Sequence, residues 1–215
     1  MSFEIIPGIL EKEWSEIERK IEEVKDFAKV IHIDIIDGKF AENTTFLDPK
    51  PFSKYTNTFT FELHMMVENP IEYLKPWAEV GFKRFYGHIE KMDDQNEFVT
   101  LGQTLGEVGL ALNGPTPISE IKVALNEIDS VLIYTAQAVG FSGASFQDNR
   151  LEKVKEIRAK STINIEVDGG INSEVIKKAQ SAGADRFAST GFLFKKNPHD
   201  QYLSLKNSLD KNSAQ

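Results

Sequence analysis

The chain has 215 residues, and its 33 acidic against 25 basic side chains give a net charge of −8, which argues against binding to nucleic-acid phosphates. It contains no cysteine, so a disulfide scaffold is excluded and any metal ion must be held by His, Asp or Glu. The sequence shows no leader pattern and no apolar run near about 18 residues, so we expect no membrane association and a cytoplasmic location.

Short β-rich runs alternate along the chain with longer segments of helical period. The expected strands are 3–7, 30–37, 59–66, 84–90, 109–113, 130–135, 163–168 and 186–190. The expected helices are 11–28, 70–80, 94–108, 119–127, 151–159 and 172–182. The first helix is the clearest, because Trp14, Ile17, Ile21 and Val24 recur at steps of three and four residues. Ser119 and Asn172 are expected N-caps, and Gly81 and Gly183 expected helix stops.

Eight strands joined by helices at this spacing predict an α/β fold, a (β/α)8 TIM barrel that forms one domain over residues 1–215. The connection 40–58 is weak as a helix and predicts a long loop with a short helix, and a polar tail is expected from about residue 207. An open, doubly wound sheet is the alternative, but the first strand is not followed by the glycine pattern GxGxxG.

The segment 31–38, IHIDIIDG, carries the first candidate site residues. Side chains alternate along a strand, so His32 and Asp34 share one face while Ile31, Ile33 and Ile35 take the other. The apolar face must pack on helices, so the polar pair points into the barrel near its C-terminal rim. An unpaired carboxylate there would cost several kcal/mol, so a compensating partner is expected.

Two further strands end in residues of the same kind, His64 in FELHMM and Asp168 in INIEVDGG. The simplest compensation is one divalent metal ion bound by His32, Asp34, His64 and Asp168, and this ligand set suits Zn, Mn, Fe or Co. A hydrogen-bonded network without metal is the alternative. His88 and Glu90 also face inward, either as partners of the ligands or as polar groups of the core.

Glycine-containing turns follow the last three expected strands. Because glycine lets backbone N–H groups approach an anion, and because late loops of this fold bind phosphate, these turns predict a phosphate site. Its candidate residues are Gly140, Ser142, Gly143, Gly169, Gly170, Thr190 and Gly191. The alternative is that these glycines only make turns.

Taken together, these motifs resemble the ribulose-phosphate 3-epimerase family over about residues 5–194. The resemblance is carried by IPGIL (6–10), HIDIIDGKF (32–40) with Asn43, ELHMMVENP (62–70), HIE (88–90), LNGPTP (112–117), GFSGASF (140–146) and EVDGGIN (166–172). It implies a ribulose-phosphate-binding type of barrel that binds a divalent metal through the four residues above. It also implies that Asp34 and Asp168 are the catalytic acid/base pair, that the late glycine loops hold the phosphate, and that the protein is a homo-oligomer.

The departures from the family pattern lie around the substrate rather than at the metal. Glu11 stands where the family usually has Ser, and Lys39 lies within an altered DGKFAEN segment. Ile36 and Tyr134 replace methionines, whereas Met66 is retained. Met66, Glu11 and Tyr134 are therefore expected in the substrate pocket.

The leading functional hypothesis is a metal-dependent epimerase that inverts C3 of a ketose phosphate, either D-ribulose 5-phosphate or a related pentulose or hexulose phosphate. Two carboxylates would remove and return the proton through an enediolate. An aldolase or lyase that uses a similar enediolate is one alternative, and a catalytically silent sugar-phosphate-binding homologue is another.

Overall fold

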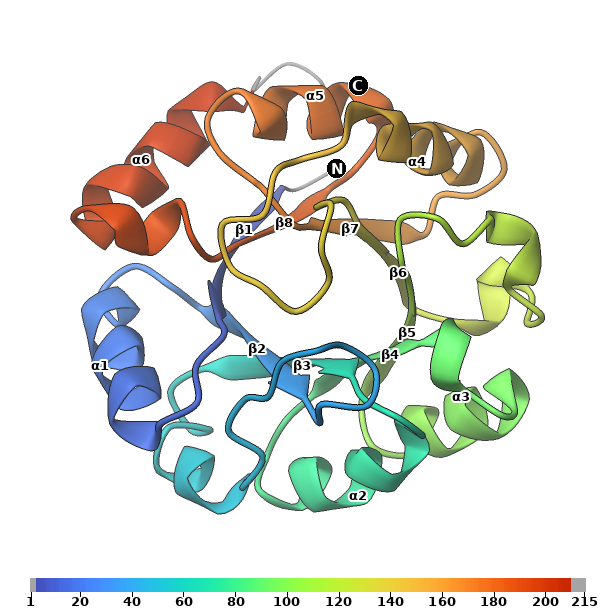
Figure 1. The fold of residues 1–215 in the computed structure, drawn as a ribbon, viewed down its shortest axis with the longest axis horizontal. Helices are drawn as coiled ribbons and strands as arrows, with labels where there is room; N and C mark the ends of the chain where they lie inside the picture. The colour runs from blue at the N-terminus through green and yellow to red at the C-terminus, as the bar shows by residue number, and fades with distance from the viewer. Residues whose placement is uncertain (1–2, 210–215) are drawn as a thin grey trace.

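The structure, a computed structural model, describes residues 3–209. Its eight strands are parallel, pair in chain order and close into a barrel through the pairing of β1 with β8 (Figure 1). The strands are β1 (Glu4–Ile9), β2 (Val30–Ile36), β3 (Thr60–Met66), β4 (Arg84–His88), β5 (Glu107–Leu112), β6 (Ser130–Tyr134), β7 (Asn164–Asp168) and β8 (Arg186–Ser189). The predicted TIM barrel is therefore confirmed, and the open sheet is not formed.

Helices surround the barrel as an outer layer (Figure 1). They are α1 (Trp14–Val24), α2 (Ile71–Glu79), α3 (Gln95–Gln103), α4 (Leu151–Arg158), α5 (Val175–Ala182) and α6 (Pro198–Ser208). In α1 the expected stripe is turned inward, with Ile17, Ile21 and Val24 buried. Burial of such a stripe supplies most of the stability of a short helix.

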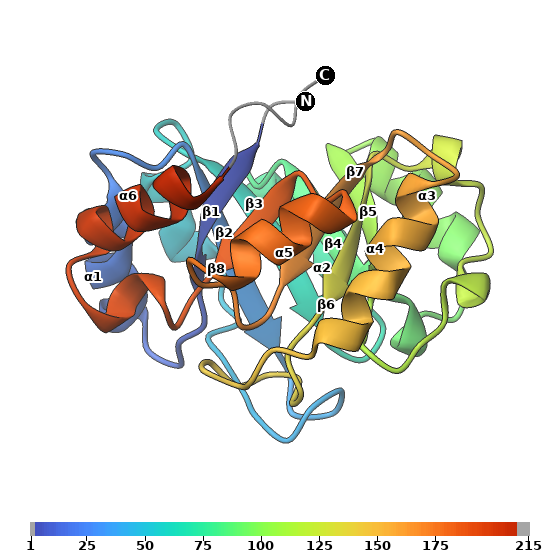
Figure 2. The same ribbon diagram turned by 90° about the horizontal axis from the view of Figure 1, so that it is seen from above.

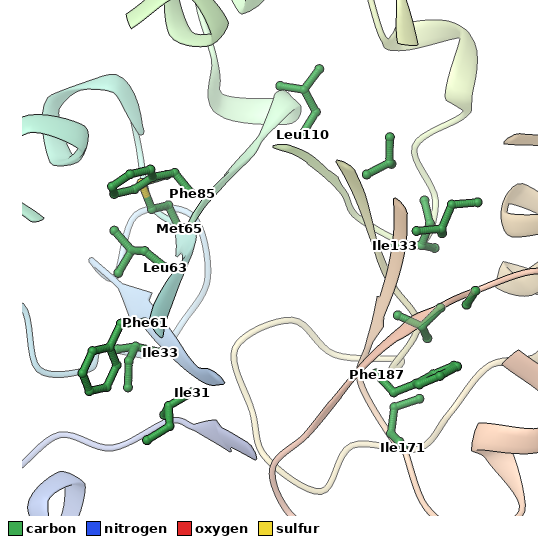
Figure 3. Close-up of a cluster of buried hydrophobic side chains, with 14 of the residues drawn as sticks. Ile31, Ile33, Phe61, Leu63, Met65, Phe85, Leu110, Ile133, Ile171 and Phe187 are labelled. Carbon is green, nitrogen blue, oxygen red and sulfur yellow. The ribbon is translucent and has the colours of Figure 1, made fainter. Parts of the chain in front are cut away.

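The main hydrophobic core lies between the outer face of the barrel and the helices (Figure 3). On β2, Ile31, Ile33 and Ile35 belong to this core, as do Phe61 and Leu63 on β3. Since strand side chains alternate, the intervening residues of both strands face the barrel interior. This alternation places polar side chains inside the barrel while its outer face remains apolar.

The predicted helix 119–127 is wrong. Two short 3₁₀ helices, η3 (Ile118–Glu120) and η4 (Leu125–Glu127), stand in its place. The Gln95 side chain donates to the carbonyl of Glu120 and accepts from the N–H of Lys122, at 2.8 and 2.7 Å. Because these peptide groups bond to another element, they are not paired along an α-helix, and Ser119 is not an α-helical N-cap.

Several element ends also differ from the prediction. The expected helix 94–108 stops at Gln103, and the chain from Glu107 is already strand β5. A helix that was not expected, α6, runs to Ser208, so residues 207 and 208 are helical rather than part of the predicted tail, whose residues 210–215 lie outside the described part. The helix stop at Gly183 is confirmed, with φ of 110°.

The long connections after β2 and β6 project from the same end of the barrel, the end to which the strands point (Figure 2). The side-chain amide of Asn43 donates to the carbonyl of Gly140 at 2.7 Å and joins the two loops. The loops therefore frame the C-terminal mouth. Within residues 3–209 no helix is both long and apolar enough to cross a lipid bilayer.

Candidate functional site

A cavity of about 370 Å³ opens at the C-terminal mouth, within the size range of small-ligand sites. Asp34 and Asp168 lie in its wall, together with Met66 and Tyr134. Both aspartates are nearly buried, and they come from β2 and β7, which are separated by β1 and β8. The active-site end of this fold therefore contains a cavity with two carboxylates at its base.

The structure brings the four predicted metal ligands together. One ligand atom from each of His32, Asp34, His64 and Asp168 lies within 4.8 Å of all the others, and all four residues are buried. Strand pairing explains part of this geometry, because Asp34 on β2 is directly opposite His64 on β3. Three separate strands thus supply side chains that meet at one point.

The ring of His32 is oriented from below by carboxylates. Its Nδ1 lies 2.7 Å from Glu62 Oε1 and 3.1 Å from Glu166 Oε1. Burial opposes ionisation of Glu62, but His32 and Arg84 outweigh it and lower the pKa of Glu62 to about 2. Since the ionised Glu62 carboxylate only accepts, Nδ1 carries a proton, and in the neutral ring Nε2 presents a lone pair. This Nε2 lies 3.2 Å from Asp34 Oδ1, so a lone pair and a carboxylate face each other.

The ring of His64 shares Asp34 with His32 and also approaches Asp168. His64 Nδ1 lies 2.8 Å from Asp34 Oδ1 and 3.3 Å from Asp168 Oδ2. Burial disfavours the protonated rings, but Asp34 and the other nearby carboxylates outweigh it, so the pKa values of His32 and His64 are raised. The site therefore demands positive charge between the imidazoles and the aspartates.

A divalent cation fits this demand. Two aspartates carry a formal charge of −2, and two neutral imidazoles present lone pairs toward them. One divalent cation would neutralise the two carboxylates and bond to all four facing donor atoms. In its absence, protonation of the two imidazoles supplies the same charge, as their raised pKa values indicate. A mixed set of two nitrogen and two oxygen donors is typical of transition-metal sites.

An ionic layer lies beneath the site, near the beginnings of the strands. Arg84 Nη1 is 2.6 Å from Glu62 Oε2, and Arg84 Nε is 2.8 Å from Glu107 Oε2. Glu166, also fully buried, has its pKa raised to about 7 by burial and by the charge of Glu62. The alternation of side chains along a strand places Glu62 and Glu166 on the inward faces of β3 and β7. It gives no sign that both would contact His32.

All of the predicted phosphate residues line the same cavity. They are Gly140, Ser142, Gly143, Gly169, Gly170, Thr190 and Gly191. Gly143 and Gly170 have positive φ of 82° and 79°, a backbone conformation that favours glycine. Within residues 3–209, the N–H groups of Gly143, Gly170 and Gly191 make no hydrogen bond to protein. They are available as donors to an anion.

Not every expected pocket residue reaches the cavity. Glu11 does not line it, because its carboxylate pairs with Lys20 of α1 at 2.6 Å. Lys39 pairs with Glu68 on the surface. Conversely, sequence reasoning missed Phe141 and Lys195, which both line the cavity. Their positions just beyond the glycine turns were the available signal for them.

The fold is shared with known structures of sugar-phosphate enzymes. The 3-keto-L-gulonate-6-phosphate decarboxylase of Vibrio cholerae superposes with a TM-score of 0.75 at 15% identity, and the match covers 97% of both chains. The 3-hexulose-6-phosphate synthase of Salmonella typhimurium gives a TM-score of 0.72 at 12% identity, over 96% of this chain and 98% of the other. At such identities the likeness shows the fold alone.

Sequence relatives are more informative. The ribulose-phosphate 3-epimerase of Schizosaccharomyces pombe is 30% identical over 96% of this chain and 94% of its own length. The cytoplasmic isoform from Oryza sativa is 32% identical, over 88% and 86%, and the Bacillus subtilis enzyme 29% identical, over 93% and 96%. Residues 4–194 match the sequence profile of the ribulose-phosphate 3 epimerase family. The chain therefore belongs to this family of carbohydrate epimerases, which are enzymes of the isomerase class.

Proposed function

We propose that the protein interconverts D-ribulose 5-phosphate and D-xylulose 5-phosphate by inverting C3, with Asp34 and Asp168 as the acid/base pair. The observation that supports this most directly is the convergence of two buried carboxylates in the wall of a cavity that, within residues 3–209, is also lined by backbone N–H groups without a protein acceptor. Such a cavity can hold a phosphorylated sugar by one end while proton transfer takes place at the other.

The proposed reaction needs a base on one face of C3 and an acid on the other. One aspartate removes the C3 proton, which lies alpha to the C2 ketone, and leaves an enediolate. The other aspartate, protonated beforehand, delivers its proton to C3 from the opposite face. The two carboxyl groups have then exchanged protonation states, and proton exchange with solvent restores the starting form.

We further propose that His32, Asp34, His64 and Asp168 hold one divalent ion, with Zn, Mn, Fe and Co as the candidates. When bound, such an ion supplies Lewis-acid polarisation of the ketone and stabilises negative charge on the enediolate. The chain itself supplies the orientation, because Glu62 and Glu166 fix the ring of His32. The glycine turns anchor the phosphate and exclude water from that end of the cavity.

The test is isotope exchange at C3. The metal-loaded protein is incubated with D-ribulose 5-phosphate in deuterated water, and the expected product is D-xylulose 5-phosphate that carries deuterium at C3. Release of an aldehyde fragment would indicate an aldolase or lyase instead. If no ketose phosphate exchanges its C3 proton, although the sugar phosphate raises the melting temperature, the protein is a silent binding homologue and the proposal is wrong.

A further inference from the structure

His88, the last residue of β4, and Glu90, in the 3₁₀ helix η2 (Ile89–Lys91) that follows it, form a pair that the proposed proton transfer does not use. The His88 ring is fully buried, and its Nε2 lies 2.9 Å from Nε2 of His64. The two ring planes differ by 29°, and the ring centroids are 5.0 Å apart. Glu90 Oε2 lies 3.0 Å from His88 Nδ1.

The hydrogen positions in the series Glu90–His88–His64 follow from the partners of Glu90. Glu90 Oε1 accepts from the backbone N–H of Asn113 at 2.7 Å, which holds the carboxylate in place. Its other oxygen can only accept, so His88 Nδ1 carries a proton and, in the neutral ring, His88 Nε2 is an acceptor. His64 Nε2 must then donate. In a neutral imidazole this leaves His64 Nδ1 with a lone pair, directed at Asp34 and Asp168.

We propose that Glu90 and His88 are positioning residues that hold His64 in the tautomer with its proton on Nε2, so that Nδ1 is free to bind the metal ion. The inference rests on the proposed metal site. It extends the set of functional residues from the four ligands to a relay that runs from a carboxylate through two imidazoles. Such outer partners of ligating histidines set the tautomer and the basicity of the ligand.

The substitution Glu90→Gln tests the relay with little change in shape. An amide offers one acceptor and one donor, whereas the carboxylate accepts from both His88 and Asn113. If the amide oxygen stays with Asn113, the NH₂ group faces His88 Nδ1. Each hydrogen bond from residue 90 through His88 to His64 then reverses its direction. The proton then moves to His64 Nδ1, where it blocks the metal. If the amide turns the other way, two donors face each other at Asn113.

The measurement is the affinity for Zn²⁺ alone, from competition with a chelating dye at pH 7. Glu90→Gln should weaken Zn²⁺ binding about 10- to 100-fold, the usual effect of losing an outer partner. The exposed Glu120, which pairs with Lys122, provides a matched control, because Glu120→Gln removes the same charge and should leave the affinity unchanged. In a His88→Gln background the relay is already cut, so Glu90→Gln should have no further effect.

A second readout does not depend on a variant folding. In the Zn²⁺-loaded protein, ring-nitrogen NMR should show the proton of His64 on Nε2 and that of His88 on Nδ1. A His88 proton on Nε2, or a folded Glu90→Gln protein that binds Zn²⁺ within twofold of wild type, would overturn the relay alone, with turnover intact. A wild-type protein that neither binds Zn²⁺ nor exchanges C3 would instead overturn the proposed function, and the relay with it.

Discussion

The phosphate site can be tested at Gly191, where the loops after β6 and β8 approach each other. A Cβ atom added there would lie 3.2 Å from the backbone nitrogen of Gly143 and 3.0 Å from Ser142 Oγ. Gly191 is not among the glycines with positive φ, so alanine suits its backbone. The methyl group of Gly191→Ala would therefore crowd the Gly143 nitrogen, and Ser142 and Gly143 would have to shift by a few tenths of an ångström to accommodate it.

The expected magnitude follows from the donor that is blocked. A hydrogen bond to a charged group contributes about 1.5–3 kcal/mol, and about 1.4 kcal/mol corresponds to tenfold in affinity. Loss of the Gly143 N–H alone should therefore weaken phosphate binding by roughly 10- to 100-fold. The substitution leaves both aspartates in place, so KM should rise much more than kcat falls.

The assay compares wild type and Gly191→Ala in KM for D-ribulose 5-phosphate and in the Kd for inorganic phosphate. Zn²⁺ affinity and the urea midpoint should be unchanged, which controls for damage to the metal site and the fold. If KM and the phosphate Kd both stay within twofold of wild type, the glycine turns do not hold the phosphate, and that part of the proposal fails.

Three further predictions concern charge. Asp168→Asn removes one of the two proton-transfer groups and should lower kcat by at least about 100-fold in the C3 exchange assay; near-normal turnover would refute its role. Because the pKa values of His32 and His64 are raised, Zn²⁺ must displace protons, so affinity should fall as pH is lowered, and calorimetry should show buffer-dependent heats. Equal heats in all buffers would contradict this. Burial opposes ionisation of Glu90, but the hydrogen bond from His88 outweighs it and lowers the pKa from 4.5 to about 2. Ionised Glu90 thus stabilises the fold above pH 4.5, and this contribution is lost toward pH 2. The difference in the free energy of unfolding between wild type and Glu90→Gln, measured in urea, should shrink from pH 6 to pH 3. A difference that stays constant with pH would refute this role of Glu90.

The barrel and its inward-facing ligands could be predicted because two simple periodicities determine them. Strands buried on both faces read as apolar runs, and in β2 the alternation of isoleucine with His32 and Asp34 assigns each face. Helical stripes such as that of α1 assign the outer layer. These signals are local, and the closed arrangement follows from them through the regular order of the strands.

Two of the failures come from contacts that the local sequence pattern does not reveal. The segment 119–127 has a helical pattern, but Gln95 of α3 binds two of its peptide groups, and no local pattern records that contact. Likewise, nothing in the residues around Glu11 shows that Lys20 will draw its carboxylate away from the mouth. Helix α6 did carry a local signal, because Asn197 followed by Pro198 is a common helix start.

The ionic layer inside the barrel is best understood through the orientation it imposes. Interiors of this fold are mostly filled by branched hydrocarbon side chains, and a buried ion pair is often no more stabilising than apolar residues of similar volume. Glu62, held by Arg84, costs desolvation, yet it fixes the proton of His32 on Nδ1. Glu90 acts on His64 from the opposite direction through His88. Two carboxylates outside the cavity thus turn both imidazole lone pairs toward the same aspartates, and apolar replacements of equal volume could fill the space without producing that convergence.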